Sequence, residues 1–135
     1  MTRDAILIDS GALDQIVGDT RTRAIYDELR SRGFLPEIPT VVLAEGITGT
    51  RRDASINQVI RALGTRNTDE RTAHRAGNLR HQVDVGPKRR RPSGIDAIVA
   101  AHAASFDSSI ILTTDPRDLG KLADYLPNVT IIPVG

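Results

Sequence analysis

The fold is decided by the stretch Ala5-Ile6-Leu7-Ile8-Asp9-Ser10-Gly11-Ala12-Leu13. Four apolar residues in a row are typical of a strand that is buried on both faces of a parallel sheet. The run ends at the carboxylate of Asp9, and Ser-Gly follows at once, which indicates a turn directly into a helix. Ligands of open α/β sheets bind beyond the carboxyl ends of the strands, so Asp9 lies where chemistry is expected. A helix N-cap explains a single Asp at this place equally well.

A second apolar run, residues 109–113, repeats this pattern near the other end of the chain. Asp115 and Pro116 follow it, and proline favours the first position of a helix. The apolar spacing further predicts a strand over residues 129–132 and helices over residues 13–17 and 21–32. Because strands and helices alternate at both ends of the chain, we expect an α/β fold with a parallel sheet and right-handed crossovers.

The middle of the chain is predicted to be mainly helical. Two prolines keep residues 34–39 extended, and residues 40–47 are predicted as a buried helix whose second turn carries Glu45. Asp53 is expected to cap a strongly amphipathic helix that ends at Gly64. A further helix is predicted over residues 69–83, and we expect these last two helices to form a hairpin on one side of the sheet.

Residues 84–94 contain two prolines, two glycines and four consecutive basic residues, which predicts an exposed loop. The next segment, residues 95–105, is small and apolar almost all round. Such a helix is buried, and Asp96 lies in its first turn.

The composition narrows the class of protein. A chain of 135 residues, 39% hydrophobic and 26% charged, is expected to form a single domain over residues 1–135 and is not disordered. The absence of cysteine excludes disulfides and thiolate metal sites. The net charge of +1 does not by itself indicate a nucleic-acid binder. The first apolar run is too short for a signal peptide or a membrane span, so we expect a cytoplasmic protein.

Four acids are predicted to converge. Asp9 and Asp115 end two strands, while Glu45 and Asp96 lie on helices that are otherwise apolar. A carboxylate in such surroundings is costly unless it is paired or binds a cation. Four carboxylates in one pocket would raise some of their pKa values, and a divalent ion with oxygen ligands would relieve the repulsion. Such an ion activates water, which favours phosphodiester hydrolysis.

Each acid also has a simpler interpretation when taken alone. Asp9, Asp96 and Asp115 precede or open helices and could be N-caps or partners of the helix dipole. Glu45 could lie on an exposed helix face, and Asp118 could either assist the site or cap its helix. The joint pattern of the four acids favours a functional site.

Four segments resemble, in order, the four motifs of the PIN-domain ribonucleases, and more narrowly the VapC-type toxins of toxin–antitoxin pairs. They are Ile8-Asp9-Ser10-Gly11-Ala12-Leu13, Val42-Leu43-Ala44-Glu45, Asp96-Ala97-Ile98-Val99-Ala100-Ala101-His102-Ala103 and Leu112-Thr113-Thr114-Asp115-Pro116-Arg117-Asp118-Leu119. The resemblance spans nearly the whole chain and includes a minor segment, Ala76-Gly77-Asn78-Leu79. It implies a PIN-like three-layer α/β fold with a central parallel sheet flanked by helices.

The resemblance also implies metal-dependent endonucleolytic cleavage of RNA, with water as the nucleophile. The catalytic and metal-binding acids that it implies are Asp9, Glu45, Asp96 and Asp115 holding Mg²⁺ or Mn²⁺, with Asp118 as a further metal ligand. Thr113 matches a Thr or Ser that is frequent near the metal. Gly11 stands where many relatives have Ser, so a hydroxyl contact is expected to be missing. A VapB-like antitoxin and a homodimer formed by helices within residues 20–63 are the implied partners.

Two groups of basic residues are candidates for binding RNA phosphates near the acids. They are Arg51 and Arg52 after Glu45, and Lys88, Arg89, Arg90 and Arg91 ahead of Asp96. A solvated loop explains the second group equally well. We expect His102, on an apolar helix face, to be a core or helix-terminus histidine.

Other functional classes fit less well. A phosphoacceptor signalling domain needs an acidic pair at the first strand and a lysine after a later strand, whereas Lys121 lies inside a predicted helix. A haloacid-dehalogenase-like phosphatase needs Asp-x-Asp, and Gly11 occupies the second position. The remaining alternative is a PIN-like module that binds RNA or a partner without cutting.

Overall fold

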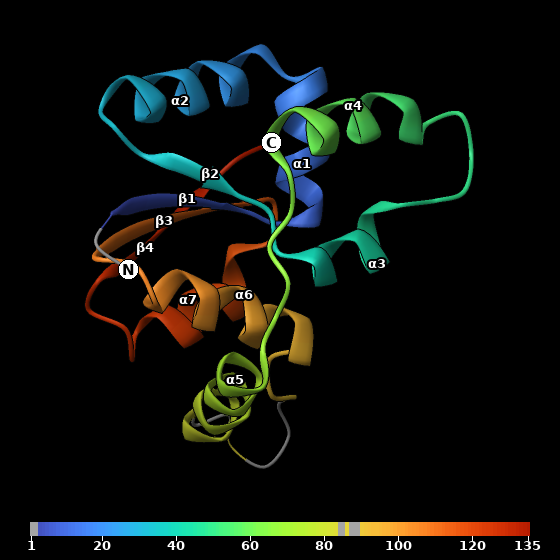
Figure 1. The fold of residues 1–135 in the computed structure, drawn as a ribbon. Coiled ribbons are helices and arrows are strands. Elements are labelled where there is room, and N and C mark those ends of the chain that lie inside the picture. The colour runs from blue at the N-terminus through green and yellow to red at the C-terminus, as the bar shows by residue number, and fades with distance from the viewer. Residues whose placement is uncertain (1–2, 84–85, 87–89) are drawn as a thin grey trace.

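A four-stranded parallel sheet forms the centre of the computed structural model, which describes residues 3–83, 86 and 90–135 (Figure 1). Its strands are β1 (Asp4–Ile8), β2 (Leu35–Glu37), β3 (Ser108–Thr113) and β4 (Val129–Pro133), in the order β2-β1-β3-β4. Ile8 of β1 pairs with Leu112 of β3, so the two central strands end together. The residues that follow them therefore meet at one edge of the sheet.

The strands at the two apolar runs and at residues 129–132 confirm the predicted sheet. In β1, Ala5 to Ile8 are fully buried because helices cover both faces. The extended piece at residues 34–39 contains a fourth strand, β2, that the periodicity did not resolve. It holds Pro36 and lies at the sheet edge, where a missing N–H costs no ladder hydrogen bond on the outer side.

Two layers of helices enclose the sheet, as Figure 1 shows. One layer holds α1 (Ser10–Gly18), α2 (Thr20–Ser31) and α4 (Asp53–Leu63), and the other holds α5 (Glu70–Gln82), α6 (Gly94–Ala104) and α7 (Pro116–Ala123). The helix predicted over residues 95–105 is confirmed as α6, whose residues from Val99 to Ala104 are all buried. None of the helices in the described part of the chain is long and apolar enough to cross a membrane.

The predicted hairpin of residues 53–63 and 69–83 is wrong. α4 lies in the layer with α1, whereas α5 packs against α6 in the opposite layer (Figure 1). The segment between them is extended beside the end of β2, where Thr40 donates to the Arg66 carbonyl and Arg66 donates to the Ile38 carbonyl. The apolar stripe of α5, with Ala76 and Leu79 buried, packs against the small side chains of α6.

The predicted buried helix over residues 40–47 is also wrong. A 3₁₀ turn, Thr40–Val42, is followed by a short helix, α3 (Leu43–Gly46), and only Val42 of these residues is buried. Three β-branched residues after a proline propagate a helix poorly. Glu45 is consequently exposed, on the first turn of α3.

Asp53 acts differently from the predicted cap. It is the first residue of α4 and is buried, and its carboxylate accepts hydrogen bonds from the amides of Thr48 and Gly49. It therefore orders the turn before the helix. Of the predicted apolar face of α4 only Ile56 is buried, and Val59, Ile60 and Leu63 are half-buried.

Candidate functional site

Asp9 follows β1 and is held in place by two neighbours. Its carboxylate accepts a hydrogen bond from the Ala12 amide at 2.9 Å, so it is the N-cap of α1. Burial raises the pKa of Asp9, the hydroxyl of Thr113 and the Ala12 amide lower it, and the charges of Glu45 and Asp115 raise it further. Asp9 thus caps a helix and also lies near two other acids, Glu45 and Asp115.

The end of β3 supplies the next two groups. Thr113 is buried, and its Oγ1 accepts the Asp115 amide at 3.0 Å, which leaves the hydroxyl hydrogen for the Asp9 carboxylate. Asp115 precedes α7, yet its side chain makes no capping hydrogen bond. The N-cap interpretation therefore does not account for the Asp115 carboxylate, which is exposed to solvent at the sheet edge.

Asp96 is the acid with the most unfavourable surroundings. It lies in the first turn of α6, a helix capped by the Ser93 hydroxyl. Burial raises the pKa of Asp96 to about 6, helped by the negative charges of Asp118, Glu45 and Asp9. Because three other carboxylates repel the ionised form of Asp96, a cation bound among them would be favourable.

Glu45 and Asp118 complete what we call the carboxylate cluster, defined as Asp9, Glu45, Asp96, Asp115 and Asp118. Exposed Glu45 is close enough to act electrostatically on both Asp9 and Asp96. Half-buried Asp118 lies 3.7 Å from the Lys121 ammonium group. The structure thus brings the five predicted acids to one edge of the sheet, each of them near at least one other.

The donor atoms of the carboxylate cluster suit a hard divalent cation. All are carboxylate oxygens, with the Thr113 hydroxyl beside them, and these are the ligands that Mg²⁺ and Mn²⁺ prefer. Among the described residues, no three acidic or histidine side chains are gathered tightly enough to grip an ion as they stand. Ion binding would therefore require rotation of side chains, which exposed Glu45 and Asp115 are free to make.

Gly11 packs directly against Thr114. A Cβ added at Gly11 would collide with the Thr114 side chain, whose Oγ1 occupies that volume. We expected a hydroxyl to be missing at residue 11. The Thr114 hydroxyl occupies the volume that a side chain at residue 11 would take.

The predicted basic residues have different surroundings. Arg51 and Arg90 are exposed, and Arg52 is 3.3 Å from Asp14. The guanidinium group of Arg91 donates to three carbonyls at the end of α5, those of Arg80, His81 and Val83. Arg91 therefore caps α5. Lys88 and Arg89 lie outside the described residues.

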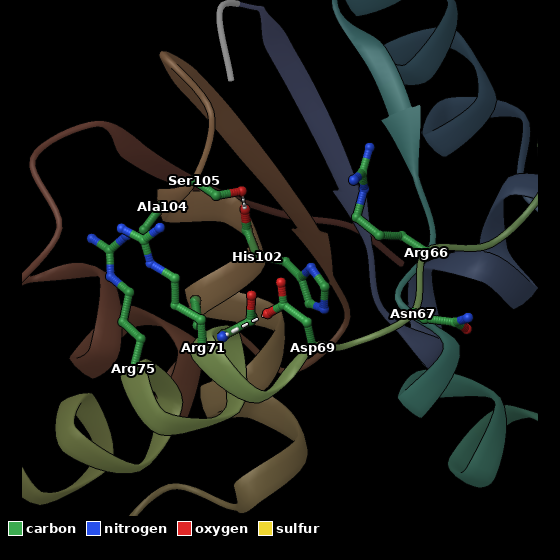
Figure 2. Close-up of a pocket in the computed structure, with 10 residues that line it drawn as sticks. Arg66, Asn67, Asp69, Arg71, Arg75, His102, Ala104 and Ser105 are labelled. Carbon is green, nitrogen blue, oxygen red and sulfur yellow. Dashed lines mark hydrogen bonds between the residues drawn. The ribbon is translucent and has the colours of Figure 1, made fainter.

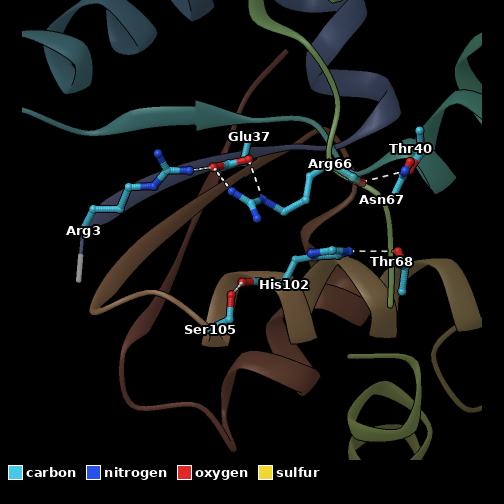
Figure 3. A network of polar contacts seen from close by, with 8 residues as sticks. All are labelled: Arg3, Glu37, Thr40, Arg66, Asn67, Thr68, His102 and Ser105. Carbon is cyan, nitrogen blue, oxygen red and sulfur yellow. Dashed lines mark hydrogen bonds and ion pairs between the residues drawn. The ribbon is translucent and has the colours of Figure 1, made fainter. Parts of the chain in front are cut away.

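A second polar network lies at the opposite end of α6 and was not predicted (Figure 3). Buried Glu37 accepts hydrogen bonds from Arg66 at 2.8 and 2.9 Å and pairs with Arg3 as well. Both guanidinium groups lie over the Phe106 ring, at 5.4 Å for Arg3 and 5.5 Å for Arg66. The network joins the start of β1, the end of β2 and the linker to α5.

His102 lies beside this network and is confirmed as a core histidine. It is buried, and its Nε2 is 2.9 Å from the Thr68 hydroxyl. Burial lowers the pKa of His102, Arg66 lowers it further, and Asp69 opposes both. His102 is therefore neutral at physiological pH.

A pocket of about 410 Å³ opens next to His102 (Figure 2). The linker to α5, the first turns of α5 and the last turns of α6 line it. Three of its lining residues are arginines, Arg66, Arg71 and Arg75. The sequence interpretation assigned no role to any of them.

Comparisons with known proteins show the fold. No protein-family model and no curated protein matches the chain. Among solved structures, the chain is similar to one in the crystal structure of VapBC2 from Rickettsia felis bound to a DNA fragment from their promoter, with a TM-score of 0.71 and 14% sequence identity over the full length of both chains. The expected PIN-like three-layer α/β fold is therefore confirmed.

Proposed function

We propose that the chain is a Mg²⁺- or Mn²⁺-dependent endoribonuclease and the toxin of a toxin–antitoxin pair. The observation that carries the proposal is the carboxylate cluster, in which burial and the negative charges of Asp118, Glu45 and Asp9 raise the pKa of Asp96 to about 6. Keeping these charges together is unfavourable without a cation. The PIN-like fold supports the choice of RNA cleavage among metal-dependent reactions.

In this proposal the acids act as metal ligands. Asp9, Asp96 and Asp115 would hold the ion, with Glu45 and Asp118 turning toward it. A bound Mg²⁺ or Mn²⁺ would supply a Lewis acid for the phosphodiester and lower the pKa of a bound water. Thr113 and the Ala12 amide keep the Asp9 carboxylate oriented, which lowers the entropic cost of binding.

The proposed partners follow from the same interpretation. Exposed Arg51, Arg52 and Arg90, with Lys88 and Arg89, would contact RNA phosphates. The similar structure is a VapBC2 complex, which supports a VapB-like antitoxin as partner.

The half-buried apolar face of α4 and exposed Ile47 support a homodimer in the region of residues 20–63. A cytoplasmic location remains the expectation.

One observation favours a second candidate, a PIN-like module that binds RNA or a partner without cutting. No three acids among residues 3–83, 86 and 90–135 are gathered tightly enough to hold an ion in the present arrangement. If the side chains did not rotate toward a metal, the same surface would bind without cleaving.

Cleavage of total cellular RNA by the purified protein separates the two candidates. The reaction is run with Mg²⁺, with Mn²⁺ and with EDTA, beside Asp9→Asn, which keeps a capping side chain. Asp107→Asn is the matched control, because Asp107 is an exposed acid at the start of β3, away from the cluster. We expect discrete fragments that need metal and Asp9 and that Asp107→Asn still yields. Folded protein that cuts nothing under either metal would support the binding module instead.

A further inference from the structure

We infer that the arginine pocket beside His102 binds a phosphoryl group, carried by a free nucleotide or by the backbone of an RNA strand. By the arginine pocket we mean the cavity lined by Arg66, Arg71, Arg75, Asp69 and His102 (Figure 2). It lies at the carboxyl end of α6, while Asp96 lies at the amino end, about 9 Å away along the helix axis. The inference does not depend on the proposed cleavage of RNA.

Arg71 and Arg75 supply the main argument. They stand one turn apart on α5, and Figure 2 shows both side chains extending from α5 toward the end of α6 at Ala104 and Ser105. Neither forms an ion pair or a side-chain hydrogen bond with any residue that the structure describes. Two like charges at this spacing repel each other. An anion bound between them would remove the repulsion and accept charge-assisted hydrogen bonds from both.

The arginines are not needed to cap α6. Helix ends leave carbonyl groups unsatisfied, and arginine often supplies donors there. Here other groups donate to these carbonyls: the Ser105 amide and hydroxyl to His102, the Ser109 hydroxyl to Ala103, and the Asn128 amide to Ala104. The exposed side chains of Arg71 and Arg75 are therefore available to a ligand.

Arg66 adds a fixed positive charge to the opposite wall. Its guanidinium group donates two hydrogen bonds to Glu37, which hold it in place, as Figure 3 shows. Glu37 is shared with Arg3, so two arginines face one carboxylate and the network keeps a net positive charge. A wall that is already ordered loses little conformational entropy when an anion binds.

Asp69 is the one carboxylate in the arginine pocket, and it is already engaged. It caps α5 by accepting the Thr72 amide at 2.8 Å, and the Thr72 bonds lower the pKa of Asp69. Three arginines and a single capped carboxylate thus line the pocket, and the charge of Arg71 also lowers the pKa of Asp69. The volume of about 410 Å³ exceeds that of a phosphate ion and has room for one nucleotide.

The His102 ring provides a direct readout by NMR, since it lines the arginine pocket. Adenosine 5′-monophosphate, adenosine and a single-stranded RNA octamer are titrated separately into the protein in EDTA. We expect the two phosphorylated probes to shift the His102 signals saturably, and adenosine to leave them in place. Unchanged His102 signals with both phosphorylated probes, or an equal shift with adenosine, would overturn the inference.

Variants test whether the two arginines carry the binding. Arg71→Gln/Arg75→Gln is compared with Arg30→Gln/Arg61→Gln, which removes two exposed charges from α2 and α4. We expect at least a tenfold loss of affinity in the first variant and less than a twofold change in the second. Equal affinity in both variants would overturn the inference. Tighter binding of the octamer than of the mononucleotide would identify RNA as the source of the phosphoryl group, and the reverse a free nucleotide.

Discussion

Asp118, in the first turn of α7, exerts the strongest electrostatic repulsion on Asp96, in the first turn of α6. Each acid is well placed for its own helix, because a negative charge near a helix amino end is stabilising. The sheet brings the two helix ends together, so that the two carboxylates, each favourable for its own helix, repel each other. This repulsion, added to burial, is the physical basis for treating the carboxylate cluster as a cation site.

The first prediction concerns the pH dependence of stability. Folded Asp96 keeps its proton up to its raised pKa of about 6, whereas the unfolded chain loses it near the ordinary Asp pKa of 3.8. The folded state therefore binds more protons in this interval, and the contribution of Asp96 to stability falls as the pH rises from about 4 to about 6. Asp96→Asn should flatten this fall and raise the melting temperature at pH 7.5. Thermal unfolding at several pH values measures both effects, and parallel pH profiles for the two proteins would refute the assignment.

The second prediction concerns metal ions. Because the ion would bind the folded state alone, Mn²⁺ should raise the melting temperature of the wild type, and EDTA should reverse the rise. Asp96→Asn should show a smaller rise than the wild type. Asp107→Asn, with its exposed acid at the start of β3, should respond as the wild type does. Equal responses of all three proteins would place the ion elsewhere.

The third prediction concerns Glu37, the buried acid of the second network. Glu37→Gln leaves Arg3 and Arg66 without their counter-charge, so we expect a loss of about 3 kcal/mol in the free energy of unfolding. Glu28→Gln is the matched control, since Glu28 pairs with Arg32 on the surface at 3.0 Å and should cost less than about 0.5 kcal/mol. Chemical denaturation measures both values. A similar small loss in both variants would show that the buried pair contributes little.

The fourth prediction concerns the contact between Gly11 and Thr114. Gly11→Ala places a Cβ against the Thr114 hydroxyl and should cost about 1–3 kcal/mol of stability. Thr114→Ala removes the obstructing atoms, so the double variant should recover most of that loss. Thermal unfolding of the three variants gives the coupling. Additive losses in the double variant would contradict the contact.

Local patterns in the sequence predicted the parts of the fold that local physics controls. The apolar runs of β1 and β3 and the small residues of α6 can only be buried, so their burial was predictable. The acids that end these strands then had to meet at one edge of a parallel sheet. The proximity of Asp9 and Asp115 therefore followed from the strand pattern, whereas the positions of Glu45 and Asp96 depend on how their helices pack.

Long-range packing explains what the sequence did not predict. α4 and α5 are neighbours in the chain, but the linker between them passes beside β2, and each helix finds its partner in a different layer. Glu37 and Arg66 are 29 positions apart, and nothing in an extended proline-flanked segment indicates that its Glu points inward. The sequence assigned no role to Arg71 and Arg75, because the end of α6 lies next to them only in the fold.

The most direct test of the central claim is a Mn²⁺ titration that follows ion binding by electron paramagnetic resonance and cleavage of one RNA substrate in the same samples. We expect that metal-free protein does not cut, that cleavage and binding rise with the same midpoint, and that Asp9→Asn weakens both while remaining folded. Cleavage that persists in EDTA, or binding of Mn²⁺ that Asp9→Asn leaves unchanged, would contradict the assignment of the carboxylate cluster as a catalytic metal site.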